Sequence, residues 1–154
     1  MEKWIIILMF FSTMNVYSFV KTVDEVESIS MNKKIPVTVI LPSKYTKNKK
    51  YSVVYGLHGW GGSFITFGRV RRIEKLADEF DLIFVFPDGK WNRWYVDSEI
   101  REDSRYSTFI SKELIRYIDE NYSTYAEREQ RAITGFSMGG FGAFYNGLKN
   151  QDIF

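Results

Sequence analysis

Residues 133–140 read Ile-Thr-Gly-Phe-Ser-Met-Gly-Gly, and this stretch decides how the rest of the chain is interpreted. Within it, Gly135, Ser137 and Gly139 match the pattern G-x-S-x-G. A serine in that pattern lies on a sharp turn between a strand and a helix, where the flanking glycines remove side chains that would clash. Chance supplies such a match in roughly one chain of this length in twenty. The surrounding sequence therefore has to decide whether the serine is catalytic.

The surrounding pattern predicts an α/β fold. Apolar and β-branched runs predict strands at residues 35–41, 51–57, 82–86 and 131–136, and helical spacing predicts helices over 70–80, 108–122 and 139–148. From residue 51 onward strands alternate with helices, which is typical of a mostly parallel sheet with flanking helices. Sites in such sheets form at the carboxyl ends of the strands. The glycine-rich loop at 58–62, the loop at 87–97 and Ser137 all follow strands, so we expect them to meet at one edge.

Composition excludes several classes of function. The net charge is +2, which gives no indication of a nucleic-acid partner. The sequence has no cysteine and one histidine, so neither a disulfide nor a zinc site is expected, and no cofactor is predicted. Four carboxylates between Trp91 and Arg105 are spaced too irregularly for a cation site, and we interpret them as a solvated acidic loop: Asp97, Glu99, Glu102 and Asp103.

The first eighteen residues resemble a secretory signal peptide. A charged start at Met1 to Lys3 precedes the apolar run Trp4 to Phe11, and small residues follow at Val16 to Ser18. The alternatives are a buried strand or an uncleaved membrane anchor. The interpretation divides the chain into a signal at 1–18 and a domain at 19–154, and it predicts a secreted or periplasmic protein with no membrane contact after cleavage.

A catalytic Ser137 would need two N–H donors for the oxyanion that forms during acyl transfer. The backbone N–H of Met138, which follows the serine, is one candidate. The backbone N–H of Trp60, in the loop after the strand at 51–57, is the second candidate. The alternative is a glycine-rich turn that carries a solvated serine with no catalytic role.

Five segments in this order, "VVYGLHGWGG", "LIFVFPDG", "WYVDS", "RYSTFISKELIRYIDENY" and "RAITGFSMGGFGA", resemble the putative-esterase family of α/β-hydrolases. That family includes S-formylglutathione hydrolase, tributyrin esterase, feruloyl esterases and the antigen 85 acyltransferases. The resemblance covers about residues 35 to 154 and implies an α/β-hydrolase fold. It also implies Ser137 as nucleophile in a Ser–Asp–His triad, with the oxyanion hole at Trp60 and Met138.

The sequence departs from the family pattern after Ser137. In this fold the acidic residue and the histidine follow the serine along the chain, but residues 138–154 contain only Asp152, which we interpret as a surface residue, and no histidine. His58 is expected to shape its loop by hydrogen bonding; a role as the base is the alternative. We therefore expect the base beyond Phe154 and a fold truncated after the nucleophile helix.

The remaining candidates concern the substrate. His58, Gly59 and Trp94 are candidates for lining the substrate pocket, and the resemblance places Trp94 near the active site. Trp91, Trp94 and Tyr95 either line an acyl or sugar pocket or form a small core under the loop. The expected function is hydrolysis of a small-molecule or carbohydrate-linked ester. An acyltransferase and a catalytically incomplete fragment or pseudoenzyme are the alternatives, and the oligomeric state is left open.

Overall fold

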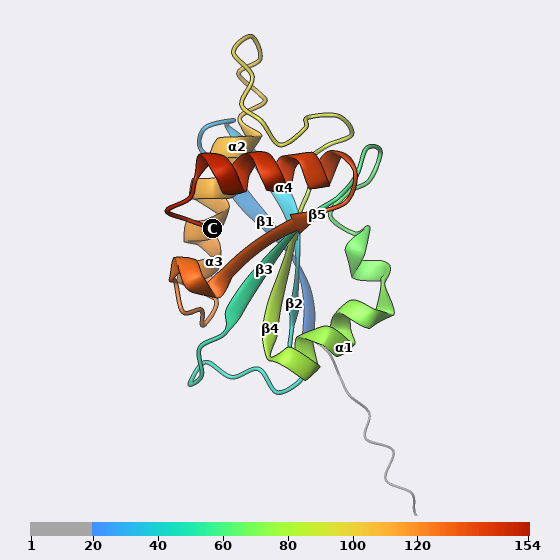
Figure 1. Cartoon of the computed structure of the whole chain (residues 1–154), viewed down its shortest axis with the longest axis vertical. Helices are drawn as coiled ribbons and strands as arrows, with labels where there is room; N and C mark the ends of the chain where they lie inside the picture. The colour runs from blue at the N-terminus through green and yellow to red at the C-terminus, as the bar shows by residue number, and fades with distance from the viewer. Residues whose placement is uncertain (1–19) are drawn as a thin grey trace, which may run out of the picture.

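A five-stranded sheet in the order β1-β2-β4-β3-β5 forms the centre of the computed structural model, which describes residues 20–154 (Figure 1). The predicted signal peptide lies outside these residues. β4 and β5 pair parallel to β3, whereas β2 pairs antiparallel to both β1 and β4, so four of the five strands run in one direction. The mostly parallel sheet predicted from the sequence is confirmed. The strands are β1 (Val20–Ser28), β2 (Lys33–Leu41), β3 (Ser52–Leu57), β4 (Leu82–Pro87) and β5 (Arg131–Gly135).

The sequence pattern did not predict β1. This strand lies at one edge of the sheet and pairs with β2 in a register that runs from Val20 opposite Leu41 to Ser28 opposite Lys33. Its sequence, VKTVDEVES, is rich in charged residues, which edge strands use to discourage pairing with other chains. The same charges conceal the strand from a search for apolar runs.

Helices cover both faces of the sheet. The helix predicted over 108–122 is a continuous helical segment in which a π-helical turn, Phe109–Leu114, joins α2 (Tyr106–Thr108) to α3 (Ile115–Asn121). None of the helices within residues 20–154 has the length and apolar character needed to cross a membrane. The other two helices are α1 (Arg71–Phe80) and α4 (Met138–Lys149), and 3₁₀ turns occupy Phe67–Arg69 and Arg128–Gln130.

Two hydrophobic cores follow from the alternation of side chains along the strands. Val53, Tyr55 and Leu57 of β3 pack into the larger core, together with residues of the helical segment at 106–121 and of α4. The smaller core lies on the opposite face, where Phe84 and Phe86 of β4 pack with residues of α1. α4 contacts β3 and β5 and crosses the sheet at the end where these strands finish (Figure 1). This places the start of α4 beside the loops that follow β3 and β4.

Candidate active site

Ser137 lies on the sharp turn between β5 and α4. Its backbone has φ 54° and ψ −117°. Residues other than glycine rarely adopt this conformation, which costs on the order of 1–3 kcal/mol. A Cβ on Gly135 would lie 2.2 Å from the carbonyl oxygen of Gly139, and a Cβ on Gly139 would lie 1.9 Å from that of Leu57. Both glycines are therefore required sterically, as the G-x-S-x-G pattern predicted. The strained turn leaves the serine exposed at the sheet edge.

The loop after β3 lies against this turn. A Cβ on Gly59 would lie 3.5 Å from the Cβ of Ser137 and 3.2 Å from the carbonyl oxygen of Phe136. The chain can therefore pass this close to the serine because Gly59 has no side chain. The convergence of the 58–62 loop with the serine, expected from the strand order, is observed.

The two predicted oxyanion donors are placed on either side of this contact. Met138 is the first residue of α4, where backbone N–H groups have no partner within the helix, and Trp60 lies in the adjoining loop. Between described residues, no hydrogen bond uses the backbone N–H of Trp60 or Met138. The positive end of the helix dipole also favours negative charge here. Their role as an oxyanion hole stays a prediction.

The His58 ring is buried and has both nitrogens engaged. Nε2 accepts a hydrogen bond from the backbone N–H of Gly89 at 2.9 Å, and Nδ1 lies 2.8 Å from the carbonyl oxygen of Gly59. This pattern requires a neutral ring with its proton on Nδ1. The ring therefore ties the loop after β3 to the loop after β4 and does not itself line an open pocket. No basic nitrogen is left to take a proton from Ser137.

The Asp88 carboxylate lies next to the His58 ring and to Lys90. Its Oδ1 lies 3.4 Å from Nε2 of His58, and its Oδ2 lies 3.4 Å from the ammonium of Lys90. Burial alone would raise the pKa of this carboxyl, but the pKa lies below its ordinary value because the nearby ammonium of Lys90 favours the ionised form. Asp88 is thus ionised at neutral pH and places a negative charge between the loops that follow β3 and β4.

Tyr95 connects the loop after β3 to α4 through hydrogen bonds, a role that the sequence did not reveal. Its hydroxyl donates to the carbonyl oxygen of His58 at 3.0 Å, and its own carbonyl oxygen accepts from the Asn146 side chain of α4 at 2.9 Å. A Cβ on Gly89 or on Gly142 would lie within 2.6 Å of the Tyr95 side chain. Because the ring is fully buried, the pKa of its hydroxyl is raised well above the ordinary value, and it stays a donor. Tyr95 belongs to the larger hydrophobic core, so it neither lines an open pocket nor forms a separate small core under the loop.

Exposed aromatic side chains from three segments meet beside the serine. The ring centroid of Trp94 lies 6.2 Å from that of Trp60 and 5.6 Å from that of Phe141, both with edge-to-face geometry. Trp94 and the following residue have positive φ angles of 54° and 58°, so the loop is strained where it presents this side chain. Trp94 thus contacts Trp60 and Phe141, and its role in lining a substrate pocket stays a prediction. The sequence did not identify Phe141 as its neighbour.

Two of the four carboxylates in the acidic loop bind other groups of the protein. Asp97 accepts hydrogen bonds from the backbone N–H of Thr108 at 2.9 Å and from its hydroxyl at 2.7 Å. Asp103 forms ion pairs with two arginines. Within residues 20–154, no group of histidine and carboxylate side chains is suited to hold a metal ion.

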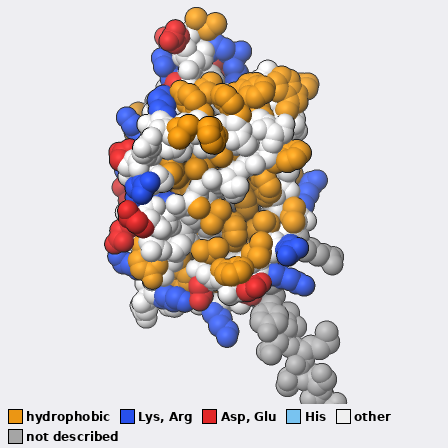
Figure 2. Space-filling view, in the orientation of Figure 1, with side chains coloured by type: hydrophobic (Ala, Val, Ile, Leu, Met, Phe, Trp, Pro, Cys, Tyr) orange, Lys and Arg blue, Asp and Glu red, His pale blue; other side chains and the backbone are white. Residues whose placement is uncertain are grey.

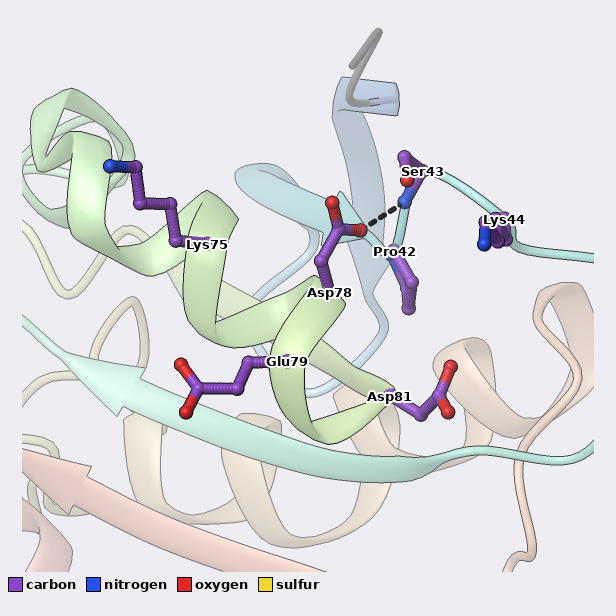
Figure 3. Close-up of a pocket in the computed structure, with 7 residues that line it drawn as sticks. All are labelled: Pro42, Ser43, Lys44, Lys75, Asp78, Glu79 and Asp81. Carbon is purple, nitrogen blue, oxygen red and sulfur yellow. Dashed lines mark hydrogen bonds between the residues drawn. The ribbon is translucent and has the colours of Figure 1, made fainter. Parts of the chain in front are cut away.

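A different hollow, of about 550 Å³, lies far from these loops, where β2 ends and β4 begins. Figure 3 shows Asp78 directed towards Ser43, whose backbone N–H it binds at 2.6 Å, while the side chains of Lys75 and Glu79 point away from Ser43. Asp78 stabilises the chain directly after β2, and this hollow contains none of the predicted site residues, so size alone does not identify the site.

Residues 28–154 match the family described as "Putative esterase". The chain belongs to this family of serine hydrolases. An esterase of Mycobacterium tuberculosis is 40% identical over 112 residues, which cover 70% of this chain and 24% of the mycobacterial protein. An acetyl esterase of Caldicellulosiruptor saccharolyticus is 30% identical over 132 residues, which cover 80% of this chain and 49% of that protein.

The fold is that of the α/β-hydrolases. A ferulic acid esterase superposes with a TM-score of 0.78 at 30% sequence identity, covering 90% of this chain and 56% of that structure. An S-formylglutathione hydrolase from Agrobacterium tumefaciens superposes equally well at 22% identity. The predicted family and fold are confirmed. The chain spans about half the length, or less, of these relatives.

Proposed function

We propose that Ser137 is the nucleophile of a carboxylic-ester hydrolase that works through an acyl-serine intermediate. The observation that carries the proposal is the turn at Ser137, where the strained backbone and two sterically required glycines hold an exposed hydroxyl at the start of α4. In this proposal the serine oxygen attacks the acyl carbonyl and the alcohol leaves. Water then hydrolyses the acyl-serine.

The N–H groups of Met138 and Trp60 stabilise the oxyanion in the proposed mechanism. Donors of this kind act on the charge that develops in the transition state, and removal of one costs about 10²–10³ in rate. They need no reorientation because one is fixed by the helix and the other by the loop that His58 braces. Their hydrogen-bonding freedom within the described residues supports this role.

A residue outside residues 1–154 is proposed to supply the general base. The sequence has a single histidine, and both of its ring nitrogens are engaged in bracing loops. The chain also spans only 49% of the acetyl esterase and 56% of the ferulic acid esterase. Without the base, this chain would be the catalytically incomplete form of the enzyme, which is the second candidate function.

Acetyl or feruloyl esters of carbohydrates are the proposed substrates, and an acyltransferase that uses an alcohol in place of water is the close variant. The relatives named acetyl esterase and ferulic acid esterase support this choice. The exposed aromatic side chains of Trp60, Trp94 and Phe141 offer a surface on which an aromatic acyl group or a sugar ring can pack. Secretion, with cleavage near Phe19, is part of the same proposal.

Labelling with a fluorophosphonate tests the nucleophile. Intact-protein mass spectrometry and peptide mapping are expected to locate a single adduct on Ser137. Ser137→Ala should remove the adduct, and Ser63→Ala, a change in the neighbouring glycine-rich loop, should retain it. An adduct on another residue while Ser137 stays unmodified would refute the proposed nucleophile, and labelling of Ser137 at the rate of a typical serine esterase would refute the absence of the base.

A further inference from the structure

A hollow of about 370 Å³ lies between the loop at 92–104 and α4. The side chains that give it chemical character are Arg93, Trp94, Ser98, Arg101 and Phe141. It is separate from the hollow at the opposite end of the sheet, and only Trp94 was a candidate from the sequence.

The aromatic wall of this hollow leads to the nucleophile. Trp94 and Phe141 contact each other edge to face, with centroids 5.6 Å apart. The backbone N–H of Phe141 donates to the carbonyl oxygen of Ser137 at 3.1 Å, so this side chain lies one helical turn from the serine. A substrate with its ester bond at Ser137 can therefore extend over the aromatic pair into the hollow.

The charged side chains that line the hollow are both arginines. Asp103 forms an ion pair with each arginine. Its Oδ2 lies 3.3 Å from Nη2 of Arg93, and its Oδ1 lies 3.4 Å from Nε of Arg101. Each guanidinium has five N–H donors, so the remaining donors can serve a ligand. Arg93 is mostly buried, with 17% of its side chain exposed, and its direction is therefore fixed. The Ser98 hydroxyl accepts a hydrogen bond from the backbone N–H of Arg101 at 3.1 Å and keeps its own proton for a ligand oxygen.

We propose that this hollow binds a carboxylate of the substrate, carried by an acidic sugar residue of a carbohydrate-linked ester. The planar fork of an arginine matches a carboxylate and can bind it through two N–H groups. The sugar ring packs on Trp94 and Phe141, and Ser98 binds a ring hydroxyl. The inference rests on the proposed function for the role of Ser137, and it adds the class of substrate.

Equilibrium dialysis with two probes that differ only at the carboxylate tests this site. Methyl glucuronoside is expected to bind the Ser137→Ala chain at least about tenfold more tightly than methyl glucoside. Arg101→Gln should reduce binding of the glucuronoside to the level of the glucoside, and Arg72→Gln, an exposed arginine on α1, should leave it unchanged. Because these measurements involve no reaction, they are independent of the labelling of Ser137.

Arg101→Lys separates recognition from folding. It keeps the charge but not the fork, so glucuronoside binding should weaken less than in Arg101→Gln while the melting temperature stays that of the parent chain. Equal affinity for the two probes, absence of binding, or unchanged binding in Arg101→Gln would each overturn the proposal. Labelling of Ser137 without discrimination between the probes would refute the acidic-sugar site and leave the proposed hydrolase standing.

Discussion

β4 and β5 flank β3 and run in the same direction, yet they differ in burial. In β4 every residue from Ile83 to Pro87 is buried. In β5 no residue is fully buried, and Ala132 and Thr134 are exposed. β4 has β2 on its other side, whereas β5 has no further strand among the described residues. The strand that leads into Ser137 is thus the less covered of the two.

The exposed surface beside β5 continues onto α4. Phe136, Phe144 and Leu148 are 71%, 72% and 57% exposed. Figure 2 shows hydrophobic side chains gathered over α4 and the adjoining part of the sheet. An open apolar strand edge is a template for pairing with another chain. The comparison indicates that the turn at Ser137 is formed, whereas the apolar surface beside it is exposed among the described residues.

The largest effect is expected where α4 meets β3. Gly139→Ala places a Cβ 1.9 Å from the backbone of Leu57, which cannot move without displacing the strand. We expect a loss of about 4 kcal/mol or more in the free energy of unfolding and no labelling of Ser137. Chemical denaturation measures the first quantity and mass spectrometry the second.

Gly140→Ala is the matched control for this change. Its Cβ would lie 3.4 Å from the nearest atom, an ordinary contact, and alanine favours the helix by about 0.5–1 kcal/mol. If Gly139→Ala proved as stable as Gly140→Ala, the steric account of the turn at Ser137 would be wrong.

Removal of matched side chains from the two strands tests the contrast in burial. Ile83→Ala in β4 empties a fully buried site and should cost about 3 kcal/mol. Ile133→Ala in β5 removes a half-buried side chain and should cost about 1 kcal/mol. Urea denaturation gives both values, and equal costs would show that β5 is covered in solution.

The dependence of stability on acid pH tests the role of Asp88 in the loop that follows β4. The pKa of Asp88 is lowered in the folded chain, so its stabilising contribution is complete above the unfolded pKa of about 4 and is lost as the pH falls through the folded value. Asp88→Asn should therefore reduce stability at pH 7 and flatten the loss of stability below about pH 4. Thermal melting between pH 2 and 7 measures this, with exposed Asp152→Asn as the control. A parallel pH curve for Asp88→Asn would contradict the assignment.

The smallest change in stability is expected on the uncovered face. Phe144→Ser should change the free energy of unfolding by less than about 0.5 kcal/mol, since the side chain is 72% exposed. It should nevertheless reduce self-association in size-exclusion chromatography. A parent chain that is already a monodisperse monomer with a sharp melting transition would refute the exposed-edge interpretation.

The turn at Ser137 could be predicted from the sequence because its G-x-S-x-G pattern is local. A Cβ on Gly135 would collide with Gly139, four residues away, whereas the collision at Gly139 is with Leu57 of β3 and is seen only in the folded chain. The buried strand β4 was equally predictable from its unbroken apolar run. β1 was not, because an edge strand with alternating charges lacks that run.

Other features depend on contacts between distant segments. The role of Tyr95 arises from contacts with His58, 37 residues away, and with Asn146, 51 residues away. The spacing of apolar residues predicted a helix at 108–122 but not its π-helical turn. Nothing local in the sequence marks Phe141 as a neighbour of Trp94.

The central claim is that this chain holds a formed nucleophile turn without its general base, and steady-state hydrolysis of p-nitrophenyl acetate tests it most directly. The account predicts turnover no more than about 10³–10⁴ above the uncatalysed rate, the level that an oxyanion hole and binding alone provide. Ser137→Ala should lower the rate of hydrolysis further. His58→Gln should lower this rate only to the extent that it destabilises the folded chain. A rapid burst with turnover typical of serine esterases, abolished by His58→Gln in a folded protein, would contradict it and identify His58 as the base.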